Sequence, residues 1–363
     1  MIYFDNAATT SPIYTPQIYH NPSSPHALGI KAERALSDAR NKISKIINCA
    51  SDEIIFTSGG TESNNLAILG YSLSHCKQKT NLISTPYEHP SILAPIQFAH
   101  SRGWANASIN TLFQTPSGNV LVAISHVNHE TGDIFDINTI ADSIKKDNPT
   151  ALIHVDGVQG FCKEAVCLDN IDLYSFSGHK CHGPTGVGGL FIRKGIKLTP
   201  LISGGKQENN RRSGTENVSG IVQMAEAAEK LNHEIPANHL HVSNIKAIFI
   251  SLSDALSDIN INSIGSHTSP YILNISFLGV KGEILVHALS EKDIYVSMGA
   301  ACNSRKNSRS ALELMGFEPQ IAQSAIRLSF SPFNTLCEAE IARDVIIKEV
   351  KRLRRILGIK MAY

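Results

Sequence analysis

The chain has 363 residues, of which 42% are hydrophobic and 18% are charged, and its formal net charge is +1. This length and composition are typical of a globular protein with one large domain and a smaller one. A net charge so close to zero gives no general attraction to nucleic acid, and the sequence has no apolar run of about 18 residues that could span a membrane. We therefore expect neither direct nucleic-acid binding nor a membrane association.

The first residues, Met1-Ile2-Tyr3-Phe4-Asp5, lack the basic start and apolar stretch of a secretory signal. The seven cysteines are widely scattered and form no CxxC pair. Such an odd, unpaired set favours a reducing compartment over a disulfide framework, so we expect a cytoplasmic protein.

Strand and helix patterns alternate through the first two thirds of the chain. Runs of apolar and β-branched residues predict strands at 53–56, 81–84, 120–125, 151–155, 173–176 and 189–192. Helical patterns lie at 62–69, 91–100 and 217–231. This rhythm predicts an α/β fold with a mainly parallel sheet covered on both faces.

The pattern starts again after about residue 235. Strands are predicted at 271–277, 294–297 and 326–330, with helices at 282–289 and 337–357. The stretch 233–236, which contains Pro236, is the expected junction. We predict a large domain at 11–235 and a smaller α+β domain formed by 1–10 and 236–363.

Lys180 follows directly on the predicted strand that ends at residue 176, and Ser177 and His179 stand beside it. Desolvation at a strand exit disfavours the charged ammonium, which is the condition that a Schiff-base lysine needs. Ser177 and His179 could hold a phosphate group. The alternative interpretation is an ordinary lysine in a polar loop.

Residues 57–65 join a predicted strand to a helix and contain Gly60 and Thr61. Glycines allow backbone amides to approach an anion, and the start of the helix adds partial positive charge. The segment therefore predicts a phosphate-binding turn, although an ordinary capped turn has the same pattern.

Asp156 ends the predicted strand 151–155, where open α/β sheets place their sites, and Gln159 follows it. A buried carboxylate needs a cationic or donor partner, and the pyridinium of pyridoxal phosphate (PLP) would be one. The alternative is a helix N-cap. His89, after the strand 81–84, could stack on a cofactor ring or move protons, or it could be a plain surface residue.

Two further residues lie in the C-terminal part. Cys302 stands in a loop-like stretch of small and polar residues near Lys306, a setting that favours a thiolate, whereas the other six cysteines are expected to be packing residues. Arg327, within a predicted strand, suits bidentate binding of a carboxylate, or an ion pair between domains. A zinc site at His179, Cys181 and His182 is disfavoured, because structural zinc needs four ligands.

Taken together, these segments resemble the cysteine desulfurases of the class V aminotransferase fold. The resemblance runs nearly end to end, from 4–10 through 21–26 to 326–329. It implies PLP-dependent fold type I, a homodimer, L-cysteine as substrate and a sulfur-acceptor protein as partner. The long stretch 302–316 resembles the branch with a flexible cysteine loop.

The resemblance also implies a role for each site residue. Lys180 would bind PLP covalently, and Cys302 would be the nucleophile that takes the sulfur. The phosphate would be held by Gly60, Thr61, Ser177, His179 and, from a partner subunit, Thr215. Asp156 would face the pyridine nitrogen, Gln159 and His129 the ring hydroxyl, and His89 the ring face. Arg327 would bind the substrate carboxylate with Asn6 nearby.

The sequence departs from the family pattern at several positions. His129 stands where the family has Asn, and Gly157 stands where the family has Ala after the aspartate. Residues 206–210 read Lys-Gln-Glu-Asn-Asn where the family prefers Gly-Gln-Glu-Arg-Gly. The helix expected before Asn21 is shortened.

The sequence therefore predicts an enzyme that converts L-cysteine to L-alanine and a persulfide on Cys302, for iron–sulfur cluster or RNA-thiolation pathways. One alternative is another PLP enzyme of the same fold, either an aminotransferase or a lyase such as a selenocysteine lyase. A second alternative is a non-enzymatic scaffold.

Overall fold

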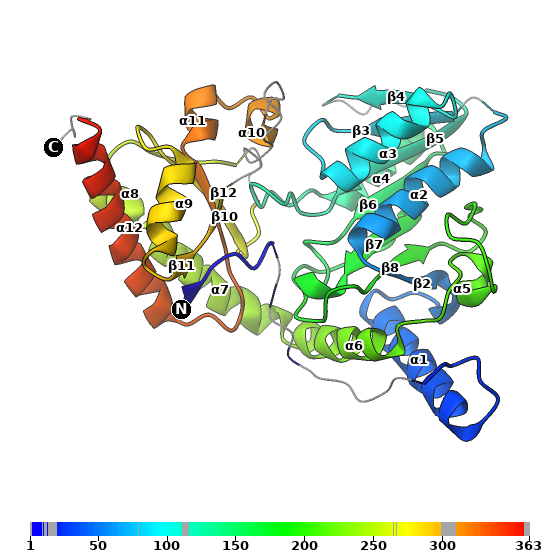
Figure 1. Cartoon of the computed structure of the whole chain (residues 1–363). Helices are drawn as coiled ribbons and strands as arrows, with labels where there is room; N and C mark the ends of the chain where they lie inside the picture. Colours follow the sequence, from blue (N-terminus) through cyan, green and yellow to red (C-terminus); the bar gives the residue numbers. More distant parts are fainter. Residues whose placement is uncertain are drawn as a thin grey trace. The chain divides into compact units, whose positions relative to one another are not determined.

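The computed structural model describes residues 2–8, 10, 13, 20–78, 80–110, 116–263, 265, 267–298 and 310–358 (Figure 1). The chain divides into two compact units. Residues 11–127 and 135–234 form one, which we call the central unit. Residues 1–10, 128–134 and 235–363 form the other, which we call the terminal unit.

The central unit is built on a seven-stranded sheet with the order β2-β8-β7-β6-β5-β3-β4. The strands are β2 (Ile54–Thr57), β3 (Thr80–Ser84), β4 (Asn106–Ile109), β5 (Asn119–Ser125), β6 (Leu152–Asp156), β7 (Leu173–Ser177) and β8 (Gly188–Ile192). All neighbouring pairs are parallel except those made by β8, which runs antiparallel to β2 and β7. The predicted mainly parallel sheet is confirmed.

Side chains on each strand alternate between two apolar layers, because successive residues of a strand point to opposite faces. On β5, Val120, Val122 and Ile124 face one layer, whereas Leu121 and Ala123 face the other. The first layer is covered by α1 (Ala27–Ile46), α4 (Ile137–Asp147) and α6 (Val218–His233). The second is covered by α2 (Gly60–Ser74) and α3 (Pro90–Ser101), so that helices cover both faces of the sheet.

The terminal unit surrounds a separate core. Its four-stranded antiparallel sheet has the order β12-β13-β10-β9, and β1 pairs with β11 in parallel. The strands are β1 (Ile2–Tyr3), β9 (Ile259–Ile261), β10 (Ile272–Phe277), β11 (Ile294–Tyr295), β12 (Ser297–Met298) and β13 (Ala325–Ser329). The helices are α7 (Ile235–Ile250), α8 (Leu252–Ala255), α9 (Gly282–Ser290), α10 (Ala311–Leu314), α11 (Pro319–Gln323) and α12 (Leu336–Ile356).

The division into units differs from the expected one at residues 128–134, which belong to the terminal unit. This stretch bonds to the terminal unit through its backbone: Ile134 N donates to His267 O at 2.9 Å, and Ser269 N donates to Gly132 O at 2.8 Å. The expected junction around Pro236 is the first turn of α7, where proline is tolerated because its missing N–H has no helical partner.

Candidate active site

The predicted catalytic residues of the central unit gather at the carboxyl ends of two adjacent parallel strands. Asp156 is the last residue of β6, and Ser177 is the last residue of β7. Lys180 ends the short 3₁₀ turn Gly178–Lys180 that follows β7. Because parallel strands end at the same edge of a sheet, these side chains share one rim of the central unit.

Ser177 lies beside the first turn of α2. A Cβ placed on Gly59 would be 3.6 Å from Ser177 Oγ, and one on Gly60 would be 3.7 Å from Ser177 Cβ. Ser177 Oγ is fully buried, and the described residues offer it no hydrogen-bond partner. A buried hydroxyl facing the amino end of a 15-residue helix is suited to bind a phosphate oxygen.

The Asp156 carboxylate is buried and held by two donors. Val158 N donates to Oδ1 at 3.1 Å, and Asn64 Nδ2 donates to Oδ2 at 2.9 Å. An ionised carboxylate has about four acceptor sites, so two bonds leave room for a further N–H donor such as a pyridinium.

His179 and Lys180 share their surroundings with a second lysine. Lys163 Nζ donates to Gln159 Oε1 at 3.2 Å, and both residues are buried. Burial first, and then the charges of Lys180 and Lys163, lower the pKa of His179 to about 4. The His179 ring is therefore neutral at neutral pH and can offer one ring N–H to a phosphate oxygen.

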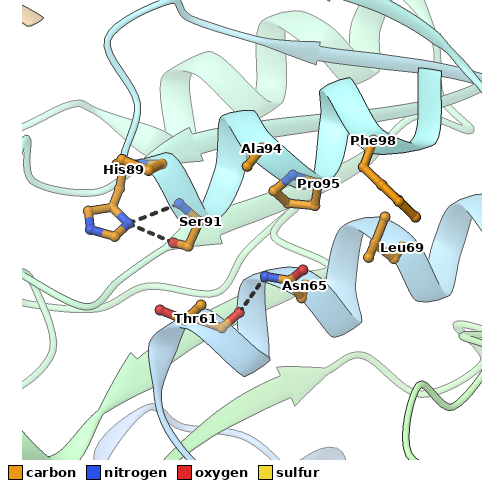
Figure 2. A pocket seen from close by; sticks show the side chains of 9 residues that line it. Thr61, Asn65, Leu69, His89, Ser91, Ala94, Pro95 and Phe98 are labelled. Atoms are coloured by element: carbon orange, nitrogen blue, oxygen red, sulfur yellow. Dashed lines mark hydrogen bonds between the residues drawn. The ribbon is translucent and has the colours of Figure 1, made fainter. Parts of the chain in front are cut away.

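His89 is the N-cap of α3 and lines a groove between α2 and α3 (Figure 2). Its Nδ1 accepts a hydrogen bond from Ser91 N at 3.1 Å. The groove has a volume of about 690 Å³ and is lined by Thr61, Asn65, Leu69, His89, Pro90, Ser91, Ala94, Pro95 and Phe98. His89 and Thr61, two of the predicted site residues, thus open on the same groove.

The segment that carries Thr215 is tied to the start of α2. Arg212 Nε donates to Glu62 Oε1 at 3.0 Å, and Gly214 N donates to Gln207 Oε1 at 2.9 Å. Burial raises the pKa of Glu62, but the hydrogen bonds from Arg212 and Ser58 outweigh it and hold this pKa below its ordinary value. Thr215 itself is exposed.

The terminal unit holds the other predicted residues. Arg327, on β13, donates from Nη1 to His129 O at 2.8 Å and from Nη2 to Asp5 Oδ1 at 3.3 Å. Its Nη1 also lies 3.8 Å from Glu130 Oε1. These contacts fix the guanidinium within the terminal unit.

His129 and Asn6 are placed by short contacts in the same unit. His129 Nε2 lies 3.6 Å from Glu130 Oε1. Asn6 Nδ2 donates to Ser329 O at 3.1 Å, which ties the N-terminal segment to β13.

Cys302 and most of its loop lie outside the described residues. Among the six described cysteines, Cys162 and Cys181 are buried, but Cys76, Cys167 and Cys337 are exposed. The expectation that all six are packing residues is therefore wrong for these three.

Neither a metal site nor a membrane-spanning helix is found among the residues that the structure describes. No three or more His, Cys, Asp or Glu side chains are arranged there to hold a metal ion, including those around His179 and Cys181. No helix in this part of the chain has both the length and the apolar character needed to cross a membrane.

Three buried residues near the predicted site were not expected from the sequence: Asn64, Ser91 and Glu88. Asn64 is four residues after Gly60, so one helical turn places it beside the strand ends. That spacing was the available signal, but a polar residue in a helix usually faces solvent.

The residues of the central unit fit PLP. The unsatisfied Ser177 hydroxyl at the start of α2 matches a phosphate, and the remaining acceptor sites of Asp156 match a protonated ring nitrogen. Lys180 follows both in sequence, on the turn after β7.

Comparison with known proteins also points to a PLP-dependent family, and the matches cover nearly the whole chain. The family described as Aminotransferase class-V matches residues 2–341. Cysteine desulfurase IscS of Dictyoglomus turgidum is 34% identical, covering 100% of this chain and 98% of that protein. Cysteine desulfurase IscS of Buchnera aphidicola subsp. Schizaphis graminum is 35% identical, covering 97% and 93%.

Two solved structures of NifS-like proteins also match nearly the whole chain. A NifS-like protein is 33% identical, with a TM-score of 0.88 and coverage of 97% of this chain and 99% of that chain. A NifS-like protein from Rickettsia africae is 26% identical, with a TM-score of 0.85 and the same coverage. This chain therefore belongs to the class V aminotransferase family.

Proposed function

We propose that this chain is a PLP-dependent cysteine desulfurase that converts L-cysteine to L-alanine and leaves a persulfide on Cys302. The observation that carries the proposal is its full-length similarity to proteins named cysteine desulfurase, in a chain that retains Lys180, Asp156 and Ser177 at one rim.

PLP, when bound, withdraws electrons from the substrate α-carbon and so makes its proton acidic. Ser177, His179, Gly60 and Thr61 are proposed to hold the phosphate, with Thr215 from a partner subunit. Asp156 is proposed to face the ring nitrogen, and Gln159 and His129 the ring hydroxyl.

The substrate is oriented and deprotonated by residues of this chain. Arg327 binds the α-carboxylate, with Asn6 nearby, and Lys180 Nζ removes the α-proton. The Cys302 thiolate attacks the substrate sulfur, the carbon–sulfur bond breaks, and a proton returned to that carbon completes alanine. The sulfur remains on Cys302 as a persulfide.

The assembly and the partners extend the proposal. We infer a homodimer, because Thr215 is exposed in its own chain and is proposed to serve the neighbouring site. The persulfide is passed to an acceptor protein of iron–sulfur cluster assembly or RNA thiolation. We place the reaction in the cytoplasm, since seven scattered cysteines suit a reducing compartment.

The test is to incubate the purified, PLP-loaded protein with L-cysteine and a thiol reductant. Alanine and sulfide should form in equal amounts over many turnovers. A protein that binds PLP but produces neither would contradict the proposal. Pyruvate and ammonia without alanine would instead support the lyase alternative.

A further inference from the structure

Asn64 joins two residues of the proposed site through a buried hydrogen-bond chain. Its side chain has no exposed surface and lies on α2 between β6 and the start of α3. Asn64 Nδ2 is 2.9 Å from Asp156 Oδ2 and 2.8 Å from Ser91 Oγ. Ser91 Oγ is in turn 2.7 Å from His89 Nδ1.

The direction of each hydrogen bond follows from what its groups can donate. An ionised Asp156 carboxylate only accepts, so Asn64 must turn its amide nitrogen toward it. The same nitrogen donates its second hydrogen to Ser91 Oγ. Since Ser91 has a single hydroxyl hydrogen, that hydrogen is left to donate to His89 Nδ1.

The orientation of Asn64 leaves its carbonyl oxygen buried without a hydrogen-bond partner among the described residues. An unsatisfied buried acceptor lowers stability, and an apolar side chain at this position would avoid that loss. The two hydrogen bonds that Asn64 donates therefore explain the presence of an asparagine at this buried position better than packing does.

The ring of His89 is held at one nitrogen by two donors. Ser91 N donates to Nδ1 at 3.1 Å, in addition to the hydroxyl of the same residue. Figure 2 shows both contacts at one ring nitrogen, with the second nitrogen on the far side of the ring. Because Nδ1 accepts, the hydrogen of the neutral imidazole is on Nε2.

We propose that Asn64 and Ser91 are positioning residues that fix His89 as the Nε2–H tautomer and make it a stationary hydrogen-bond donor. Such a ring has no free acceptor nitrogen: Nε2 carries the hydrogen, and Nδ1 is engaged by Ser91. His89 then orients the group in front of it, while Lys180 moves the α-proton. This inference rests on the proposed function, which places His89 against the cofactor.

The primary test reads the tautomer directly, without activity. Holoenzyme labelled with ¹⁵N in its histidine rings is examined by long-range ¹⁵N–¹H NMR, and the His89 signal is assigned from its loss in His89→Gln. The expected pattern is a protonated Nε2 and a hydrogen-bonded, unprotonated Nδ1. A protonated Nδ1 in the wild-type protein would overturn the proposal.

Ser91→Ala and Ser91→Thr test the hydroxyl. Ser91→Ala should move the Nδ1 signal toward that of a free nitrogen and lower kcat about three- to tenfold, as expected for one lost hydrogen bond. Ser91→Thr keeps the hydroxyl and should restore both values. Ser72→Ala is the matched control, because this buried serine of α2 donates its hydroxyl hydrogen to Ile68 O of its own helix. An unmoved Nδ1 signal in Ser91→Ala would refute the proposed bond.

Asn64→Asp tests the link to Asp156. It replaces the double donor by a carboxylate of the same shape and should change the His89 signals as Ser91→Ala does. Asn65→Asp makes the same chemical change one residue away, where Nδ2 donates to Thr61 O of its own helix, and should leave the signals unchanged. If both variants shifted the His89 signals equally, the added negative charge alone would explain the shift, and the proposal would be contradicted.

A comparison of His89→Gln with His89→Leu separates a donor from a base. Glutamine retains an N–H donor, so it should keep about tenfold more activity than leucine. Equal losses of activity in His89→Gln and His89→Leu would show that a proton-accepting ring is needed, which would contradict the donor role. If the wild-type protein shows the expected tautomer but makes no alanine from cysteine, the proposed function fails while the positioning inference stands.

Discussion

The ring of Tyr174 occupies the space beside Gly157 that a larger side chain would need. A Cβ on Gly157 would lie 1.9 Å from Tyr174 Cζ and 2.3 Å from its hydroxyl oxygen. Tyr174 is fully buried, and its hydroxyl lies 3.2 Å from His126 Nδ1. The glycine that stands where the family has alanine is thus matched by the tyrosine on the neighbouring strand.

Gly157→Ala should therefore lower the free energy of unfolding by about 3 kcal/mol, since a fully packed ring cannot move aside. In a Tyr174→Ala background the same substitution should cost less than about 1 kcal/mol, because the space is then open. Urea unfolding of the four proteins measures this coupling. Equal costs in both backgrounds would contradict the steric explanation.

The buried carboxyl of Glu88 makes stability depend on pH. Burial raises its pKa to about 7, assisted by the charge of Asp156, although hydrogen bonds from Ser125 and Thr85 act in the opposite direction. The ordinary value is 4.5, so the folded state binds more protons than the unfolded state between about pH 4.5 and pH 7. The contribution of Glu88 to the free energy of unfolding therefore falls as pH rises through this window.

Glu88→Gln cannot ionise, so its stability relative to the wild type should rise from pH 4.5 to pH 7, by at most about 3 kcal/mol. Melting temperatures of both proteins across this range give the comparison. Glu33→Gln makes the same charge change at an exposed position of α1 and serves as control. A flat difference for Glu88→Gln would contradict the raised pKa.

The segment before Arg212 contains residues in a left-handed conformation. Lys206 has φ 68° and Asn210 has φ 63°, and these are the two positions at which the family prefers glycine. Lys206 is also exposed, so its side chain gains little by contact. The local backbone thus retains the shape that glycine would favour.

Lys206→Gly should raise the free energy of unfolding by about 1 kcal/mol, because glycine adopts positive φ without the Cβ clash. Lys31→Gly, at an exposed position within α1, should lower it by about 1 kcal/mol. The same Lys→Gly change should therefore raise the free energy of unfolding at one site and lower it at the other, which thermal unfolding measures. A loss of stability at Lys206 would show that its side chain has an unrecognised contact.

Two substitutions should separate the halves of the proposed reaction. Lys180→Ala removes the base and the covalent attachment, so cysteine should no longer exchange its α-proton with solvent deuterium. Cys302→Ala should retain the PLP absorption and that exchange, yet release less than about 1% of the wild-type sulfide. Normal sulfide release by Cys302→Ala would assign the nucleophile to another residue.

Arg327→Lys should raise KM for cysteine by about 10- to 100-fold and leave PLP binding unchanged, because lysine cannot form two parallel bonds to a carboxylate. The guanidinium is already oriented by His129 O and Asp5, so a lysine would also lose these contacts. Steady-state kinetics and a PLP titration test the two parts. An unchanged KM would contradict the proposal that Arg327 binds the substrate carboxylate.

Regular elements with a clear period were predictable. The strands β5, β6 and β7 lie within two residues of their predicted ends, since their apolar runs are uninterrupted. The helix α1 was not predicted, although Ala32, Leu36, Ala39 and Ile43 recur at helical spacing and are buried. The helix α7 was also not predicted, and only its first two residues were assigned, as part of the expected junction at 233–236.

Lys180 and Asp156 could be proposed as site residues from the sequence, because their residue types carry chemistry and each follows a strand pattern. Asn64 and Ser91 could not, because their proposed role depends on which neighbours they contact. Hydrogen-bond direction depends on positions set by helix packing on the sheet, and a single sequence does not contain those positions.

The stretch 128–134 also has a consequence for how the protein is made. His129 leaves the ribosome 198 residues before Arg327, the residue that its carbonyl binds. At common rates of synthesis this interval is roughly 10 to 40 seconds. Residues up to 234, which complete the central unit, are synthesised during that time, before β13 and its arginine exist. Arg327, the residue proposed to bind the substrate carboxylate, therefore reaches its backbone partner only after the central unit has been synthesised, and a nascent chain halted before β13 would contain the proposed cofactor rim but not this arginine.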